Sequence, residues 1–156
     1  MTAEPSPTTG VIEGGEHLLP VRVYYEDTDF TGVVYHANYL HYFERGRSDF
    51  LRLRGISHTE LRDRPDPLAF VVRRMQIDFK TPARVDDALV IRTVYDRLDG
   101  PRIVVRQRIE RPSDGMADPI ASATVEVVCI RLDGRPIKPP ANILQALRLE
   151  AARPAP

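Results

Sequence analysis

The sequence predicts an α+β fold, in which an antiparallel sheet wraps around one long central helix. Apolar residues recur at intervals of three and four over residues 38–54, which is the pattern of one helix face. Four strand-like segments follow later in the chain, and short turns join them, as antiparallel neighbours require. A long helix beside one antiparallel sheet is a layered α+β architecture.

The first two elements are a strand and the long helix, joined by a short polar loop. Val21, Val23 and Tyr25 lie at the two-residue spacing of a strand. The loop letters DTDFTG then interrupt this spacing with turn-forming residues. Asn38 is expected to cap the start of the helix, and Gly55 is expected to end it.

Strands dominate the second half of the sequence. Ser57 and Glu60 have capping-box spacing and predict a short helix before these strands. The strand-like segments are RRMQIDFK, ALVIRTVYDRL, RIVVRQRIER and IASATVEVVCIRL, and Asp99-Gly100 predicts a hairpin between the second and the third. ANILQALRLEAA predicts a terminal helix. This order is that of a hotdog fold, although a cystatin-like fold begins similarly and periodicity alone does not separate the two.

Length and composition predict one domain with short flanking segments. The chain has 156 residues, enough for one hydrophobic core. Residues 1–17 are rich in Pro, Gly, Thr and Glu, so we expect a disordered N-terminal tail there. A single hotdog domain is expected over residues 18–152, and a flexible C-terminal end over residues 153–156.

Composition also restricts the partners and the compartment. Lys plus Arg and Asp plus Glu both number 22, and this zero net charge argues against a nucleic-acid partner. The N-terminus lacks the pattern of a signal peptide, and no apolar run approaches the ~20 residues of a membrane span. We therefore expect a cytoplasmic protein without stable membrane insertion. The one cysteine, Cys129, excludes an intrachain disulfide, and we expect its thiol to be buried and inert.

Two acids and a histidine gather between the first strand and the helix: Asp27, Asp29 and His36. A metal site fits poorly, because the calcium-loop pattern fails at its twelfth position, Asn38. His36 and His41 also lack the four-residue spacing of a helical zinc pair. Asp27 is as readily interpreted as a turn residue that accepts backbone N–H bonds.

Asp29 is the stronger candidate for chemistry. Gly32 permits close backbone approach, and His36 lies just before the helix, whose N-terminus exposes unpaired N–H groups. A carboxylate beside that terminus can polarise a water molecule or attack a carbonyl, while the N–H groups stabilise the oxyanion. The pattern therefore indicates acyl transfer or hydrolysis, with Asp29 as general base or nucleophile.

The stretch VRVYYEDTDFTGVVYHANYLHYFERGRSDFLR resembles the signature of hotdog-fold acyl-CoA thioesterases of the 4-hydroxybenzoyl-CoA thioesterase type. Within that family it is most similar to the bacterial branch associated with the Tol–Pal cell-envelope system. The similarity continues through VVRRMQIDFKTPARVDDALVIRT and ASATVEVVCIRLDGRPIKPP, and covers about residues 20–140. The resemblance implies an enzyme that hydrolyses acyl-CoA to a carboxylic acid and free CoA.

The resemblance also implies roles for individual residues. Asp29 becomes the catalytic carboxylate, and His36 lies beside the thioester at the entrance of the helix. One or two surface arginines are expected to hold the phosphates of CoA. The residues expected to bind substrate are Tyr35, Gly32, Asn38 and Arg102.

Family members are homo-oligomers that use no cofactor, so the resemblance implies a dimer or a homotetramer without a metal or other cofactor. Acyl-CoA is the expected substrate, and acyl carrier protein is a further candidate partner. The alternative is a non-catalytic protein that binds acyl-CoA or acyl carrier protein. Glu44 is expected to be structural, in a pair with Arg45, Arg47 or Arg74. The histidines expected to be packed or solvated are His17, His41 and His58.

Overall fold

The computed structural model describes residues 3–115 and 118–149 of the chain. Within these residues, six strands form one antiparallel sheet: β1 (Val11–Glu13), β2 (Glu16–Arg22), β3 (Leu68–Phe79), β4 (Ala88–Asp99), β5 (Arg102–Glu110) and β6 (Ala121–Arg131). Their order across the sheet is β1-β2-β4-β5-β6-β3, so β1 and β3 lie at the two edges. The α-helices are α1 (Asn38–Leu53), α2 (His58–Arg62) and α3 (Ala141–Ala146).

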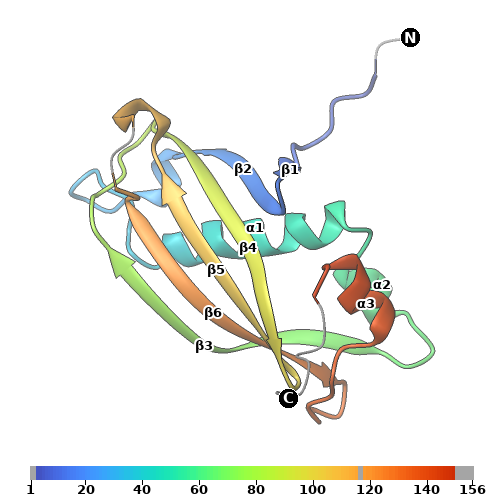
Figure 1. Cartoon of the computed structure of the whole chain (residues 1–156). Helices are drawn as coiled ribbons and strands as arrows, with labels where there is room; N and C mark the ends of the chain where they lie inside the picture. The colour runs from blue at the N-terminus through green and yellow to red at the C-terminus, as the bar shows by residue number, and fades with distance from the viewer. Residues whose placement is uncertain (1–2, 116–117, 150–156) are drawn as a thin grey trace.

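The α+β hotdog architecture predicted from the order of elements is confirmed. Figure 1 shows the sheet curving around α1, with α2 and α3 near the C-terminal end of that helix. The predicted hairpin forms between β4 and β5, where Asp99 pairs with Arg102 and Gly100 takes a positive φ of 60°. The predicted capping box also forms at α2, because Glu60 N donates to Ser57 Oγ and Ser57 N donates to the Glu60 carboxylate.

Helix α1 packs its apolar side directly on the sheet. Phe43 and Phe50 are buried there, and burial of each such ring contributes about 1.5–3 kcal/mol. Gly46 lies between them on the same face, and a Cβ at this position would come within 2.7 Å of Thr93 Oγ1 and 3.0 Å of an Ile91 methyl group. The missing side chain therefore allows the helix backbone to approach β4 closely.

A buried polar cluster holds the middle of α1 on the sheet. The Gln107 amide on β5 donates to Phe43 O over 2.8 Å and to Thr93 Oγ1 over 2.9 Å. Arg47 donates to Gln107 Oε1 over 2.9 Å and pairs with the Glu44 carboxylate over 2.8 Å. Each buried polar side chain of this cluster thus has hydrogen-bond partners, which matters because an unpaired polar group is costly in the protein interior. Glu44 therefore has the structural role predicted for it, and its partner is Arg47.

The first strand ends earlier than the sequence spacing suggested. β2 stops at Arg22, and residues Tyr25–Asp27 form a short 3₁₀ helix in which Tyr25 is 86% exposed. The physical reason is local, since the Asp27 carboxylate accepts a hydrogen bond from Tyr24 N over 2.8 Å and closes this turn. The expectation that Tyr25 continues the strand is therefore wrong.

The structure also differs from the predicted N-terminal tail. Residues 11–17 belong to β1 and β2, which a turn at Gly14-Gly15 joins. His17 is fully buried, its ring nitrogen Nε2 lies 2.7 Å from Thr9 O, and its ring packs edge-on against Phe50. These contacts order a segment whose composition alone suggests disorder. The flexible end predicted at residues 153–156 lies outside the described residues.

Three further features bear on the sequence expectations. Cys129 is buried on β6, as predicted. In the described parts of the chain, no helix is long and apolar enough to cross a membrane. Over the same residues, no group of three or more His, Cys, Asp or Glu side chains has an arrangement that could hold a metal ion.

Candidate active site

The loop that precedes α1 is a tight hairpin. Asp29 N donates to Val33 O over 2.9 Å, and Gly32 N donates to Asp29 O over 3.0 Å. Gly32 has a φ of +83°, which glycine adopts without steric cost. Val34 N donates to Ala83 O over 2.8 Å, so the segment that follows β3 holds the hairpin from one side. The loop is therefore a fixed element that presents Asp29 at its turn.

Asp27 anchors this hairpin to α1. Its carboxylate oxygen Oδ2 accepts hydrogen bonds from Tyr24 N and from the Tyr42 hydroxyl, both over 2.8 Å. Its carbonyl oxygen accepts from Tyr35 N over 2.9 Å and from the Asn38 amide over 2.8 Å. Burial, together with the bond to Asp27, raises the pKa of Tyr42, so its hydroxyl stays a donor. The geometry favours the structural interpretation of Asp27.

Asp29 has a different environment. Its oxygen Oδ1 accepts hydrogen bonds from the Thr31 hydroxyl over 2.5 Å and from Thr31 N over 2.8 Å. The Thr31 hydroxyl, and then its backbone N–H, hold the pKa of Asp29 below its usual value. Over residues 3–115 and 118–149 the other oxygen, Oδ2, accepts no hydrogen bond from protein. The result is an ionised carboxylate with one oxygen held and one oxygen open.

Thr31 is a residue that our reasoning from the sequence missed. The signal was present, because an Asp followed two residues later by a hydroxyl side chain is the spacing of an Asx turn. The positive end of a helix can also keep a nearby carboxylate ionised. The hydrogen bonds of Thr31 are the cause that the geometry supports.

His36 lies exposed just before α1 and belongs to a strip of aromatic rings. Its ring centroid is 4.5 Å from that of Tyr35 and 6.4 Å from that of Phe79 at the end of β3. Tyr39 continues the strip, with its centroid 5.5 Å from that of Phe79 and its hydroxyl accepting from Ala83 N. Among the contacts of the described residues, no hydrogen bond joins His36 to Asp29.

The remaining predicted substrate residues divide into two groups. Gly32 and Tyr35 lie on the hairpin beside Asp29 and His36. Asn38 also lies there, but the helix N-cap is Ala37, and the Asn38 amide already donates to a carbonyl of the hairpin. The prediction that Asn38 caps the helix is therefore wrong.

Arg102 lies far from this group within one chain. It pairs with Val128, whereas Phe79, which contacts His36, pairs with Ala121 and through it is level with Ile109. The seven steps along β5 from Arg102 to Ile109 span about 23 Å at 3.3 Å per residue. Figure 1 shows the β4–β5 turn at the other end of the sheet from the loop before α1. The structure does not bring Arg102 to Asp29 in the same chain.

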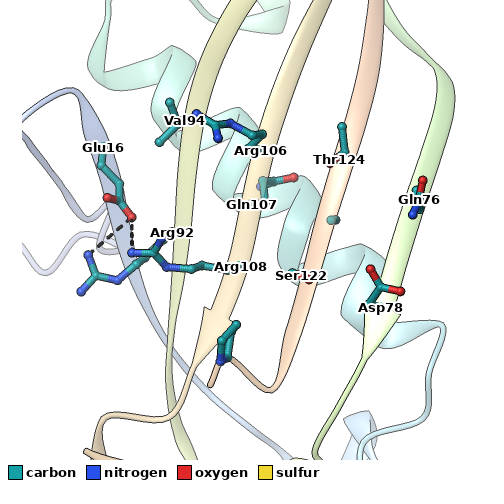
Figure 2. Close-up of a pocket in the computed structure, with 12 residues that line it drawn as sticks. Glu16, Gln76, Asp78, Arg92, Val94, Arg106, Gln107, Arg108, Ser122 and Thr124 are labelled. Atoms are coloured by element: carbon teal, nitrogen blue, oxygen red, sulfur yellow. Dashed lines mark hydrogen bonds and ion pairs between the residues drawn. The ribbon is translucent and has the colours of Figure 1, made fainter. Parts of the chain in front are cut away.

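A hollow lies elsewhere, on the face of the sheet that points away from α1. It measures about 440 Å³, and Figure 2 shows its polar lining on β3 to β6. Arg92 pairs there with Glu110 over 2.7 Å, and Glu16 contacts both Arg92 and Arg108. Arg92 and Arg108 already pair with carboxylates there, and neither Asp29 nor His36 lines the hollow, so we do not assign the active site to it. A second hollow, of about 380 Å³, includes Asp27 in its lining.

Comparison with known proteins gives the family. Residues 23–147 match the family model described as the thioesterase-like superfamily. The chain belongs to this superfamily. The acyl-CoA thioesterase YbgC of Haemophilus influenzae is 43% identical over 114 residues, which cover 73% of this chain and 80% of that protein. The acyl-CoA thioester hydrolase YbgC of Escherichia coli O6:H1 is also 43% identical, over 71% of this chain and 79% of its own length.

Two solved structures share the fold of this chain. A probable thioesterase from Bartonella henselae is 44% identical, with a TM-score of 0.74 over 80% of this chain and 99% of that one. The 1,4-dihydroxy-2-naphthoyl-CoA thioesterase of Synechocystis shares the fold, with a TM-score of 0.77 at 24% identity over 86% of this chain and 96% of that one. The family resemblance inferred from the DTDFTGVVYH segment is thereby confirmed.

Proposed function

We propose that the protein is an acyl-CoA thioesterase, which hydrolyses the thioester to a carboxylic acid and free CoA. The observation that carries this proposal is the Asp29 carboxylate, ionised, held through Oδ1 by Thr31 and open at Oδ2. The names of the YbgC relatives support acyl-CoA as the substrate class. A fixed carboxylate with one free oxygen suits either general-base or nucleophilic attack on a carbonyl.

Both routes use the free oxygen and give the same products. As a base, Asp29 Oδ2 removes a proton from water, the water oxygen bonds to the thioester carbon, and the C–S bond breaks. As a nucleophile, Oδ2 bonds to that carbon and expels the thiolate, and water then hydrolyses the mixed anhydride. In both routes the CoA sulfur leaves with the bonding electrons and takes up a proton. We assign His36, at the helix entrance, to orient the thioester or to supply that proton.

The test is the release of free thiol from a panel of acyl-CoA substrates, measured with a thiol-reactive dye. We expect turnover by wild-type protein and a fall of about a hundredfold or more for Asp29→Asn, the typical loss of a general base or nucleophile. Tight acyl-CoA binding without thiol release from any substrate would instead support the non-catalytic alternative. Thioesters of acyl carrier protein belong in the same panel, since we retain that protein as a candidate partner.

We further propose that the enzyme is a homo-oligomer built through the β3 edge. β3 is 12 residues long and lies at the edge of the sheet, where Val71, Val72 and Phe79 are 41%, 49% and 52% exposed. A long exposed edge strand with apolar side chains is a template for pairing with another chain. Light scattering at micromolar concentration checks this, and a monomer there would refute it. The cytoplasmic location stays a prediction.

A further inference from the structure

Phe30 is the most exposed large apolar side chain in the described part of the chain. It directly follows Asp29, and its relative accessibility is 102%. The aromatic rings on the inner side of α1 behave differently, since Phe43 and Phe50 are buried in the core. A phenyl group left wholly in water stabilises nothing in the isolated chain, so its apolar surface remains available to a ligand.

The backbone holds Phe30 in a fixed position relative to the carboxylate. Phe30 lies at the second position of the turn that Gly32 N closes by donating to Asp29 O. The two Thr31 hydrogen bonds to Asp29 Oδ1 tighten the same turn from within. Consecutive Cα atoms are about 3.8 Å apart, so the base of the Phe30 side chain lies near the backbone of Asp29.

We infer that Phe30 is a platform for the pantetheine arm of the substrate and thereby sets the affinity for the thiol half of acyl-CoA. This inference rests on the proposed function, because the reacting thioester carbon must come within about 3–3.5 Å of Asp29. The acyl group and the pantetheine arm then leave that carbon in opposite directions.

The exposure of the aromatic rings near Asp29 indicates where the acyl group and the pantetheine arm lie. Tyr35, His36 and Phe79 form an aromatic strip from the helix start to the sheet, and this strip suits the acyl group. The nucleotide of CoA is charged and must stay in water, so the arm that carries it runs outward. Phe30 is 102% exposed, against 47% for Tyr35 and 52% for Phe79, so it is the ring near Asp29 that is most open to an arm lying in water. Methylene groups and amides of the arm can lie on its face.

The test replaces Phe30 and varies only the thiol of the substrate. One acyl group is presented as a thioester of CoA, of pantetheine and of 2-mercaptoethanol, and kcat and KM are measured for wild type and Phe30→Ala. Contact with about half of the ring is worth about tenfold in affinity. We therefore expect Phe30→Ala to raise KM about tenfold for the CoA and pantetheine thioesters. We expect kcat to stay within about twofold, and the 2-mercaptoethanol thioester to be unaffected.

The matched control is Leu132→Ala, another exposed apolar side chain, 62% accessible, on the turn after β6. It should leave KM unchanged for all three thioesters. An equal loss for Phe30→Ala with all three thiols would overturn the inference, as would a loss that grows with acyl chain length. A change of oligomer size in light scattering would also overturn it and would place Phe30 in a subunit contact.

Binding of the product separates this inference from the proposed function. Calorimetric titration with free CoA needs no hydrolysis, so it reports on Phe30 even if wild type shows no turnover. A dissociation constant about tenfold weaker in Phe30→Ala than in wild type would support the platform. An unchanged constant, or no binding of CoA to wild type, would overturn it, whatever the outcome of the Asp29→Asn test.

Discussion

Asp27 and Asp29 carry the same charge two residues apart, yet their surroundings predict opposite responses to substitution by asparagine. The Asp27 carboxylate oxygen accepts charge-assisted hydrogen bonds from Tyr24 N and from the buried Tyr42 hydroxyl. Hydrogen bonds to a charged group contribute about 1.5–3 kcal/mol and those between neutral groups about 0.5–1.5 kcal/mol. Asp27→Asn weakens two of them by about 1 kcal/mol each, a total of about 2 kcal/mol.

This loss has a thermal equivalent that can be measured. For a chain of about 150 residues, 1 kcal/mol shifts Tm by about 2–4 °C, so Asp27→Asn should lower Tm by about 4–8 °C. Turnover should fall only modestly, because the reacting carboxylate is retained. Tyr42→Phe is the matched control, and it should give a comparable shift, since it removes one whole hydrogen bond to the carboxylate, worth about 1.5–3 kcal/mol.

Asp29→Asn should show the reverse balance. The two bonds from Thr31 are exposed to water, unlike the bond that buried Tyr42 donates to Asp27, and the amide keeps an oxygen that can accept them, so Tm and oligomer size should stay near those of wild type. The free anionic oxygen is lost, so thiol release should fall by about a hundredfold or more. Both variants are tested by measuring thermal unfolding and steady-state thiol release from one acyl-CoA that the wild-type protein hydrolyses. Near-full turnover in Asp29→Asn, or a hundredfold loss in Asp27→Asn at unchanged Tm, would refute the assignment of roles.

Four smaller predictions follow from the same geometry. Thr31→Val removes the hydroxyl that lowers the pKa of Asp29, so the acid limb of the pH–rate profile should move to higher pH, while Thr31→Ser should leave it in place. Gly46→Ala should lower the free energy of unfolding by about 1–2 kcal/mol, measured by urea unfolding. The added methyl group costs about 1–3 kcal/mol by overpacking, which exceeds the gain of up to about 1 kcal/mol in helix propensity. A stabilised variant would contradict the close helix–sheet contact. Burial raises the pKa of Cys129 to about 11, so its thiol should react with the assay dye only after unfolding, and rapid labelling of native protein would contradict this. His36→Ala should lower turnover but leave residual activity, since the backbone N–H remains, and wild-type turnover would show that the side chain is dispensable.

Features that depend on neighbours in the sequence could be predicted from it. The periodicity of α1, the capping box of α2 and the Asp99-Gly100 hairpin all depend on residues within a few positions of one another. The concentration of Asp29 and His36 before the helix is equally local. The different roles of Asp27 and Asp29 were also inferred, from the turn and helix chemistry around each, and the structure supplies the partners that this inference lacked.

Features that depend on distant partners could not be predicted. His17 ends a segment rich in Pro, Gly, Thr and Glu, and its packing against Phe50, 33 positions later, shows why this segment is ordered. Arg102 became a candidate because of its charge, and only the register of β5 against β6 and β3 shows that it lies at the far end of the sheet. Gly46 carries no signal of close approach until the helix is placed on β4.

The two edges of the sheet are unequal, and this limits how copies can assemble. On one side β1 covers β2 over only three residue pairs, and Pro20, which has no N–H to donate, lies further along β2. On the other side β3 offers 12 residues of backbone. A chain that can pair through one sheet edge only must contact a second copy through that same edge. The contact is two-fold symmetric, and it leaves no further edge free for pairing. Pairing of copies through sheet edges would then end with a two-fold pair, because the short N-terminal strand makes the second edge a poor template for further chains.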